Sequence, residues 1–225
     1  MLLALIPARG GSKSIKKKNL ALLGDKPLLY YTIKAAKESE CIQEIVVSSE
    51  DEEILEYAKS QGVSILKRPK ELAQDTSRSN EVVEHCLKHY PNYEEFILLQ
   101  ATSPFRRAEH VEQAYEKFKK EDSQALISVC TYEKTILKAF VLNERGCLKG
   151  ICNDSFPFMP RQELPEVFMA NGAIYLGKVK NFLKNPTFLA EQTSYFLMDT
   201  LSSLDIDEPS DLQKANEILK EQKWR

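Results

Sequence analysis

The sequence is poor in the residues that build disulfide frameworks and zinc knuckles. Its five cysteines are an odd number, and no two of them form a Cys-x-x-Cys pair. A disulfide scaffold needs an even, closely spaced set, and a structural zinc site needs paired ligands. We therefore expect reduced, mostly structural thiols. No cysteine has a neighbouring histidine that would mark it as an activated nucleophile.

Long apolar runs and a strong net charge are also missing. No run approaches the ~18 residues of a membrane span, and the N-terminal apolar stretch is short for a signal peptide. Lysine plus arginine total 31 against 33 acidic residues, a net charge of -2. Such a balance gives no general attraction to nucleic acid or membranes. These absences predict a cytoplasmic protein with neither kind of partner, and its 43% hydrophobic content predicts one large domain.

Short apolar runs alternate with amphipathic stretches along the first 131 residues. Residues 49–52 also read S-x-x-E, a capping box for the second helix. Alternating strands and helices with short connections predict a mostly parallel, doubly wound α/β sheet. The expected strands are residues 2–6, 44–49, 64–66, 95–100 and 125–131, and the expected helices are residues 27–37, 52–58, 80–90 and 108–121.

The alternation stops near residue 132. Residues 135–175 read as short strands and loops, which predicts a small β-rich lobe at about residues 133–190 within a single domain of residues 1–225. Aromatic residues between 156 and 168 favour a core or an interface over a ligand pocket. Two further strands are expected at residues 195–198 and 203–207, followed by a helix over residues 209–223.

A glycine pair and five cationic side chains follow the first expected strand, between Arg9 and Asn19. In an open α/β sheet, this loop is a common phosphate site. Gly10 and Gly11 can adopt backbone angles that other residues avoid, and they let N–H groups approach an anion. The loop matches neither the Walker A nor the dinucleotide pattern. A simple turn with solvated lysines stays open as an alternative, and so does a nucleic-acid patch at residues 16–18.

Asp205 and Asp207 lie two residues apart in one of the expected strands. Side chains two apart on a strand share a face, and Mg²⁺ favours one or two carboxylates together with phosphate oxygens. The alternative is that Asp207 caps the helix expected to begin near Pro209. Glu81, His85 and His89 form a helical stripe without further ligands, and we assign this stripe no role.

Five blocks stand out along the sequence: IPARGGSK with KN at 18–19, RP with LAQD at 68–75, LLQATSPFR at 98–106, RQ with NGAIY at 161–175, and SLDID at 203–207. In this order they resemble blocks of the sugar-activating cytidylyltransferases, above all the bacterial CMP-sialic acid synthetases. The resemblance covers nearly the whole chain. It implies that CTP and a nine-carbon 2-keto sugar acid, N-acetylneuraminate first, give the CMP-sugar and pyrophosphate with Mg²⁺.

The resemblance also implies a nucleotidyltransferase sheet, a lobe that forms a homodimer, and a role for each matched residue. The nucleotide would be held by Arg9, Ser12, Lys13, Lys18, Asn19, Arg68 and Ser79. The sugar acid would be contacted by Gln100, Lys138, Arg161, Asn171 and Tyr175, and by Phe188 of the partner subunit. Asp205 and Asp207 would bind Mg²⁺ and, with Arg9 and Lys18, carry catalysis.

Two positions depart from the family pattern. Ser14 stands where a glycine or a basic residue is usual, and Ala101 stands where proline is usual. Neither change removes a charged group. Legionaminic, pseudaminic or 3-deoxy-octulosonic acid remain alternative substrates, and a nucleotide-binding homologue without catalysis remains an alternative function.

Overall fold

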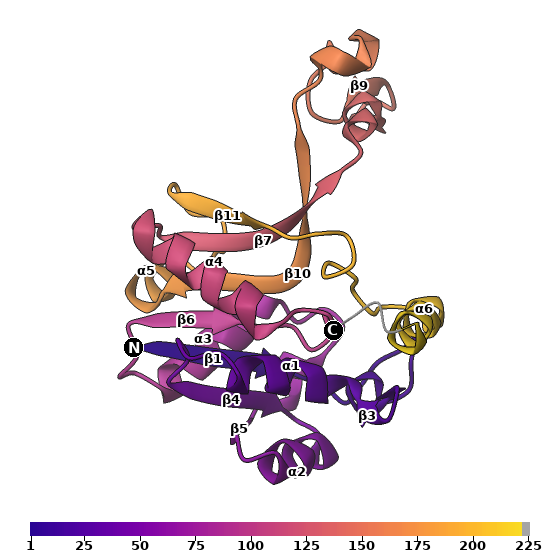
Figure 1. Ribbon diagram of the computed structural model, residues 1–225. Helices are drawn as coiled ribbons and strands as arrows, with labels where there is room; N and C mark the ends of the chain where they lie inside the picture. The colour runs from indigo at the N-terminus through magenta and orange to yellow at the C-terminus, as the bar shows by residue number, and fades with distance from the viewer. Residues whose placement is uncertain (222–225) are drawn as a thin grey trace. The chain divides into compact units, whose positions relative to one another are not determined.

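The computed structural model describes residues 1–221 and contains a seven-stranded sheet with the strand order β11-β7-β10-β6-β1-β4-β5 (Figure 1). The strands are β1 (Leu2–Pro7), β4 (Glu44–Ser49), β5 (Ser64–Lys67), β6 (Glu95–Leu98), β7 (Ala125–Tyr132), β10 (Val167–Lys178) and β11 (Thr193–Leu197). The helices are α1 (Leu28–Lys37), α2 (Glu52–Ser60), α3 (Ser79–His89), α4 (Ala108–Lys120), α5 (Val179–Lys184) and α6 (Pro209–Lys220).

The sheet is mostly parallel, as the sequence predicts. Strand β1 pairs in parallel with β4 and β6, β4 with β5, and β7 with β11. Strand β10 is the exception, because it runs antiparallel to β6. Apolar periodicity is the same in either direction, so the sequence pattern gives no sign of this reversal.

Both faces of the sheet are covered, and the alternation of side chains along β1 shows how. Leu2, Ala4 and Ile6 lie in one apolar core with residues of α1, α2 and α4. Leu3 and Leu5 lie in a second core with residues of α3 and α5. A strand buried on both faces reads as a continuous apolar run. The prediction of a doubly wound sheet is therefore confirmed.

A third apolar cluster joins the C-terminal segment to the start of the chain. The short hairpin β2 (Leu22–Leu23) and β3 (Lys26–Pro27) brings Leu23 against Ile206 and Ala215 of the α6 region. Ile206 is fully buried, and its N–H donates to the carbonyl of Thr102 at 2.8 Å. The cluster thus holds residues 205–207 beside the loops that follow β1 and β6.

Several local expectations are wrong. Residues 203–207 form no strand, because Ile206 is held by this apolar cluster and not by a neighbouring strand. The cap of α2 is Asp51, whose Oδ1 accepts from the N–H groups of Glu53 and Ile54, so the expected capping box is absent. Pro27 precedes α1 as its N-cap. The last helix ends at Lys220, and the end expected for it, residue 223, lies outside the described residues.

The chain divides into two compact units. Residues 1–129 and the residues from 170 onward form the first unit, and residues 130–169 form the second. Its hairpin pairs β8 (Phe140–Leu142) with β9 (Leu148–Gly150), and the short helices η3 (Lys134–Lys138), η4 (Phe156–Phe158) and η5 (Arg161–Glu163) complete it. The expected lobe reached residue 190, whereas the residues from 170 onward lie in the first unit. β10 and β11 contribute to the main sheet, which explains the shorter unit.

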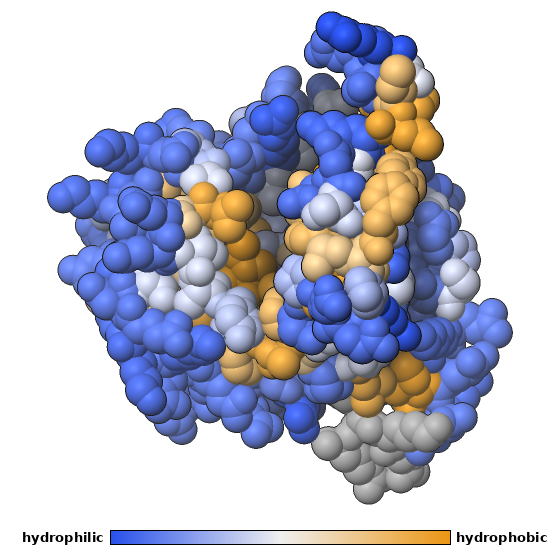
Figure 2. Space-filling view, turned by 90° about the horizontal axis from the view of Figure 1, so that it is seen from above, coloured by the Kyte–Doolittle hydropathy of each residue, from blue (hydrophilic) through white to orange (hydrophobic). Residues whose placement is uncertain are grey.

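The second unit carries many exposed apolar side chains. More than half of the large apolar residues that are exposed within residues 1–221 lie in it, among them Phe140, Leu142, Leu148 and Phe158. Figure 2 shows orange apolar groups interrupting a mostly hydrophilic surface. Along residues 1–221, no helix combines the length and the apolar character needed to cross a membrane.

Candidate active site

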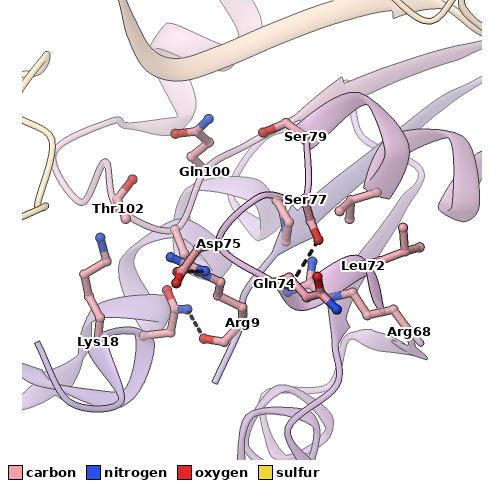
Figure 3. Close-up of a pocket in the computed structure, with 14 residues that line it drawn as sticks. Arg9, Lys18, Arg68, Leu72, Gln74, Asp75, Ser77, Ser79, Gln100 and Thr102 are labelled. Atoms are coloured by element: carbon pink, nitrogen blue, oxygen red, sulfur yellow. Dashed lines mark hydrogen bonds and ion pairs between the residues drawn. The ribbon is translucent and has the colours of Figure 1, made fainter. Parts of the chain in front are cut away.

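A pocket of about 270 Å³ opens at the edge of the sheet where the parallel strands end (Figure 3). Three loops surround it: those after β1, β5 and β6. The order β4-β1-β6 places it where the sheet reverses its winding, the usual ligand crevice of such folds. Its lining residues include Arg9, Lys18, Asn19, Arg68, Gln74, Asp75, Ser79, Gln100 and Thr102.

The glycine pair lets the backbone lie close to a neighbouring segment, and it does not adopt unusual backbone angles. Neither Gly10 nor Gly11 has a positive φ; the left-handed residue of this loop is Lys17, at φ 50°. A Cβ on Gly10 would lie 2.4 Å from the Asp51 carboxylate, whereas a Cβ on Gly11 would meet nothing within 4 Å. The expectation about angles is therefore wrong, and only Gly10 is sterically required.

Arg9 and Lys13 share one carboxylate. Asp75 accepts from Arg9 Nη1 at 2.6 Å and pairs with Lys13 Nζ at 2.6 Å. Hydrogen bonds from these two cations hold the pKa of Asp75 below its usual range. Lys13 is otherwise exposed at 85% of its side chain and does not line the pocket, whereas Arg9 does.

Arg68, in the loop after β5, forms a buried ion pair at the pocket. Its Nε and Nη2 donate to Glu50 Oε2 at 3.2 and 3.1 Å, and its side chain is only 4% exposed. Burial lowers the pKa of Arg68, and the charge of Glu50 opposes this shift. The second oxygen of Glu50 accepts from the Gly10 N–H at 2.8 Å. One carboxylate thus links β4, the Gly10 loop and Arg68.

Lys18 connects the loop after β1 to the C-terminal segment. Its Nζ donates to the Ile206 carbonyl at 2.9 Å and to Asp207 Oδ1 at 3.0 Å. Ser14, the family departure, donates through Oγ to the Asp207 carbonyl. Asn19 is buried and donates to the Arg9 carbonyl at 2.8 Å, which shapes the loop from inside.

The two aspartates of residues 205–207 have different surroundings. Asp207 is 69% exposed and paired with Lys18. Asp205 is half-buried, and its Oδ1 has no hydrogen-bond partner among residues 1–221. Burial, with a contribution from the Asp207 charge, raises the pKa of Asp205. The expectation that both project alike from a strand is wrong.

The capping alternative for Asp207 fails in this structure. Glu208 is the N-cap of α6, and Asp211 Oδ2 accepts from the N–H groups of Asp207 and Glu208. An orphaned carboxylate oxygen beside a second carboxylate suits a hard cation such as Mg²⁺. The described residues hold no cluster of three or more His, Cys, Asp or Glu for a metal. Further ligands would have to be phosphate oxygens or water.

Three other residues expected to bind substrate lie in or near this pocket. Ser79 is the first residue of α3, and Gln100 follows β6; both line the cavity. Ser12 is half-buried in the loop after β1 and does not line the cavity.

Asn171, Tyr175 and Phe188 are positioned by β10 and the segment after α5. Asn171 is buried, with both amide atoms bonded within the protein. The ring of Phe188 lies 4.9 Å from that of Tyr175 and 5.3 Å from that of Phe182. Burial raises the pKa of Tyr175. Phe188 thus packs within its own chain here, and its reach into a partner stays a prediction.

Lys138 and Arg161 belong to the second unit. Lys138 ends η3, and Arg161 Nη2 pairs with Glu133 Oε2 at 3.0 Å within that unit. Their roles toward a sugar acid also stay predictions.

Sequence reasoning missed three residues that organise the pocket. Glu50 and Asp75 pair with its cations, and Arg106 is fully buried with Nη1 donating to the carbonyls of Gln100 and Ala173 at 3.1 and 2.8 Å. Burial lowers the pKa of Arg106 to about 9. Acidic residues directly after β4 and within LAQD stand at the same sheet edge, and that placement was the available signal for Glu50 and Asp75.

Comparison with known proteins identifies the family of this chain. A family model described as cytidylyltransferase matches residues 3–223. The N-acylneuraminate cytidylyltransferase of Escherichia coli O18:K1:H7 is 37% identical over 95% of this chain and 51% of its own length. The pseudaminic acid cytidylyltransferase of Campylobacter jejuni serotype O:2 is 34% identical over 97% of this chain and 96% of its own length.

The chain spans about half the length of the N-acylneuraminate relatives that it matches. Among solved structures, a CMP:2-keto-3-deoxy-manno-octonic acid synthetase complexed with CTP superposes with a TM-score of 0.74. That match covers 98% of this chain and 99% of the other at 17% identity, so it shows a shared fold.

Proposed function

Because the chain belongs to the cytidylyltransferase family, we propose that it transfers the cytidylyl group of CTP to a nine-carbon 2-keto sugar acid and releases pyrophosphate. N-acetylneuraminate is the acid that we expect first. The observation that carries the proposal is the pocket lined by Arg9, Lys18 and Arg68, with the Asp205 and Asp207 carboxylates beside Lys18. Convergent cations at the edge of a parallel sheet suit a triphosphate.

The reaction is an in-line displacement at the α-phosphorus. The anomeric hydroxyl of the sugar acid forms the new P–O bond, loses its proton, and the bond to the β-phosphate oxygen breaks. Positioning and charge neutralisation carry most of such a transfer. Arg9, Lys13 and Lys18 neutralise the phosphates, while Ser12, Asn19, Arg68 and Ser79 hold the rest of the nucleotide.

The carboxylates of Asp205 and Asp207 are suitable ligands for Mg²⁺. Within residues 1–221, Asp205 Oδ1 is shielded and has no hydrogen-bond partner, and Asp207 offers an exposed carboxylate. These two residues would hold Mg²⁺, which would supply positive charge as the leaving pyrophosphate develops negative charge. Lys18 contacts the same segment and keeps Asp207 facing the loop after β1.

For the sugar acid, we propose contacts from Gln100 and Tyr175 in the first unit and from Lys138 and Arg161 in the second. A guanidinium can bind both oxygens of a carboxylate, which suits Arg161 for the acid group. Phe188 would act from the partner subunit of a homodimer. We also propose a contact from Asn171, whose amide is bonded within the protein to Ser128 and Ser203.

A homodimer formed through the β-rich lobe expected at about residues 133–190, which includes most of the second unit, is part of the proposal. The exposed apolar side chains of residues 130–169 support it, since large exposed apolar patches mark interaction surfaces. We place the reaction in the cytoplasm, with no nucleic acid or membrane partner.

The test is pyrophosphate release by the purified protein with CTP, Mg²⁺ and a panel of sugar acids. We expect release with N-acetylneuraminate, and the panel includes legionaminic, pseudaminic and 3-deoxy-octulosonic acids as alternatives. Pseudaminic and legionaminic acids both have specific support, because relatives matched over 96% of their own length carry those names. UTP, ATP and GTP replace CTP as controls.

The outcomes separate the candidate functions. Release with CTP and one acid identifies the substrate. CTP binding without release for any acid would favour the non-catalytic homologue, and release with another nucleotide would contradict the assignment of the base.

A further inference from the structure

The main chain of Gln100 is held by a buried guanidinium. Arg106 is 1% exposed, and its Nη1 donates to the Gln100 carbonyl at 3.1 Å and to the Ala173 carbonyl at 2.8 Å. Thr32 Oγ1 also donates to the Gln100 carbonyl, at 3.3 Å. One cation therefore joins the loop after β6 to the strand β10, and the backbone of Gln100 cannot shift without leaving buried polar groups unpaired.

The side chain of Gln100 is held less firmly than its main chain. The residue is half-buried and lines the pocket, where Figure 3 shows its amide among the side chains of the other lining residues. Among residues 1–221, no hydrogen bond fixes this amide. The position of the amide therefore depends on the room that the neighbouring segment leaves for it.

Gly172, in β10, leaves this room. A Cβ on Gly172 would lie 2.8 Å from Gln100 Oε1, closer than Cβ atoms approach other atoms in proteins, and 3.5 Å from Gln100 Cδ. The amide of Gln100 thus lies against bare backbone, and a glycine inside a strand often marks such a close approach. Gly172 also has a φ of 75°, in the left-handed region that favours glycine.

Two reasons for a glycine coincide at position 172, and Gly62 allows them to be separated. Gly62 has a similar φ of 71°, but a Cβ there would meet Lys37 Nζ at the ordinary contact distance of 3.9 Å. Alanine at position 62 would therefore introduce backbone strain alone. Alanine at position 172 would introduce the same strain and would also displace the tip of Gln100. Because that tip is the end of a flexible side chain, it can move at little cost to stability.

We propose that Gly172 is a positioning residue for Gln100: the missing side chain lets the Gln100 amide lie against β10 and so sets how that amide meets the sugar acid. The contact with the sugar acid rests on the proposed function, whereas the placement of Gln100 does not. Alanine at position 172 would turn the amide away, while Arg106 keeps the main chain in place. A misplaced hydrogen-bonding group weakens the binding of the substrate that it contacts, and the other substrate is unaffected.

The kinetic test is a double-mutant cycle measured by pyrophosphate release with the acid that the substrate panel identifies. Gln100→Ala and Gly172→Ala should each raise the KM for that acid about fivefold, the size expected for one lost hydrogen bond, and change the KM for CTP less than about twofold. The double variant should match the single variants, because Gly172 acts through Gln100. Gly62→Ala is the matched control and should leave both KM values unchanged. Rises that multiply in the double variant, or equal rises for both substrates, would overturn the proposal.

The structural test follows the NMR signal of the Gln100 side-chain amide in the substrate-free protein, which needs no activity. The signal is assigned by its loss in Gln100→Ala. It should move in Gly172→Ala and stay in place in Gly62→Ala, while both glycine variants lower the melting temperature by similar amounts. An unmoved signal in Gly172→Ala would overturn the proposal. If Gly172→Ala folds poorly, the double variant, which lacks the clash, should fold as well as Gly62→Ala, and its failure to do so would also overturn the proposal.

The two tests separate the placement of Gln100 from the proposed function. A moved Gln100 signal in Gly172→Ala, together with no pyrophosphate release by the wild-type protein for any acid, would leave the placement standing and refute the proposed function alone. Normal release by the wild-type protein, together with an unmoved signal in Gly172→Ala, would leave the proposed function standing and refute the positioning role.

Discussion

The candidate site has a basic side, with Arg9, Lys13 and Arg68, and an acidic side, with Asp205 and Asp207, which do not line the pocket itself. The two sides differ in how their charges are balanced. On the basic side, Arg9 and Lys13 share Asp75, and Arg68 is paired with Glu50. On the acidic side, Asp207 has Lys18, but Asp205 retains a shielded oxygen without a hydrogen-bond partner in the described part of the chain.

This difference indicates two modes of ligand capture. Arg9 and Lys13 already share a carboxylate of the protein itself, so we expect phosphates that bind there to compete with Asp75. At Asp205, Oδ1 has no hydrogen-bond partner within residues 1–221, and a cation there would relieve the cost of a desolvated carboxylate. Five predictions test the two halves of this comparison, beginning with the largest expected effect.

Removing the charge of Asp205 should have the largest effect. Asp205→Asn keeps the side-chain volume but removes a Mg²⁺ ligand, so we expect turnover to fall ~1,000-fold or more while the fold persists. Pyrophosphate release and circular dichroism measure the two effects. Near-normal Mg²⁺-dependent release would contradict the metal assignment.

For the same variant, we expect an effect on thermal stability that depends on pH. Because the pKa of Asp205 is raised in the folded state, its charge destabilises the protein above that pKa and ceases to do so below the unfolded value of 3.8. Without Mg²⁺, Asp205→Asn should therefore melt higher than wild type at pH 7.5, and the difference should vanish at about pH 3, below the unfolded value. Thermal denaturation at both pH values checks this, and a constant difference would argue against a buried charge.

Glu50→Gln should have the next largest effect, on stability. It leaves the buried guanidinium of Arg68 without a counter-charge, which costs about 3 kcal/mol for a buried pair. Urea unfolding measures the loss. Glu53→Gln is the control, because its pair with Lys17 is solvent-exposed and should contribute nothing measurable. Equal effects of the two variants would mean that the basic side is not preorganised by Glu50.

Asp75→Asn should have a smaller effect, and in the favourable direction. With its competing charge removed, pyrophosphate should bind about two- to threefold more tightly at low salt, and the gain should shrink as salt screens the loop. Titration calorimetry at two salt concentrations measures it. Asp122→Asn, which removes the exposed partner of Lys178, is the control. Weaker binding in Asp75→Asn would show that Asp75 orders the loop and does not compete with phosphate.

Ser14→Gly should have the smallest effect. It removes the hydrogen bond to the Asp207 carbonyl, while Lys18 still holds the same segment. We expect kcat/KM for CTP to fall by less than about threefold, since an exposed hydrogen bond contributes little. Lys16→Ala, an exposed neighbour, should change nothing. A loss as large as that of Asp205→Asn would mean that this contact controls the carboxylate segment.

Much of the fold was predictable because burial on both faces leaves a clear signature. The run at β1 has no polar position, and the helices that follow carry one apolar stripe each, so the doubly wound sheet could be inferred. The loop after β1 could be placed at the strand ends for the same reason. The antiparallel direction of β10 could not, because it depends on pairing with β6 across some eighty residues.

The candidate site was less predictable than the fold. Asp205 and Asp207 could be identified as a pair, but a strand was expected there because Leu204 and Ile206 alternate with them. Ile206 is buried against Leu23 and Phe105, a tertiary contact that local pattern does not encode. Glu50 and Asp75 were missed for a related reason: the sequence shows charges, but only the folded chain shows which charges meet.

The contact between Lys18 and Asp207 joins residues that are 189 positions apart. Contacts so distant along the chain close late, because loop entropy opposes them until the intervening sheet has formed. During synthesis, the loop after β1 leaves the ribosome well before its acidic counterpart, so Lys18 lacks Asp207 while the 189 positions that separate them are made. The proposed catalytic competence should thus arise late in folding, once the first unit has assembled.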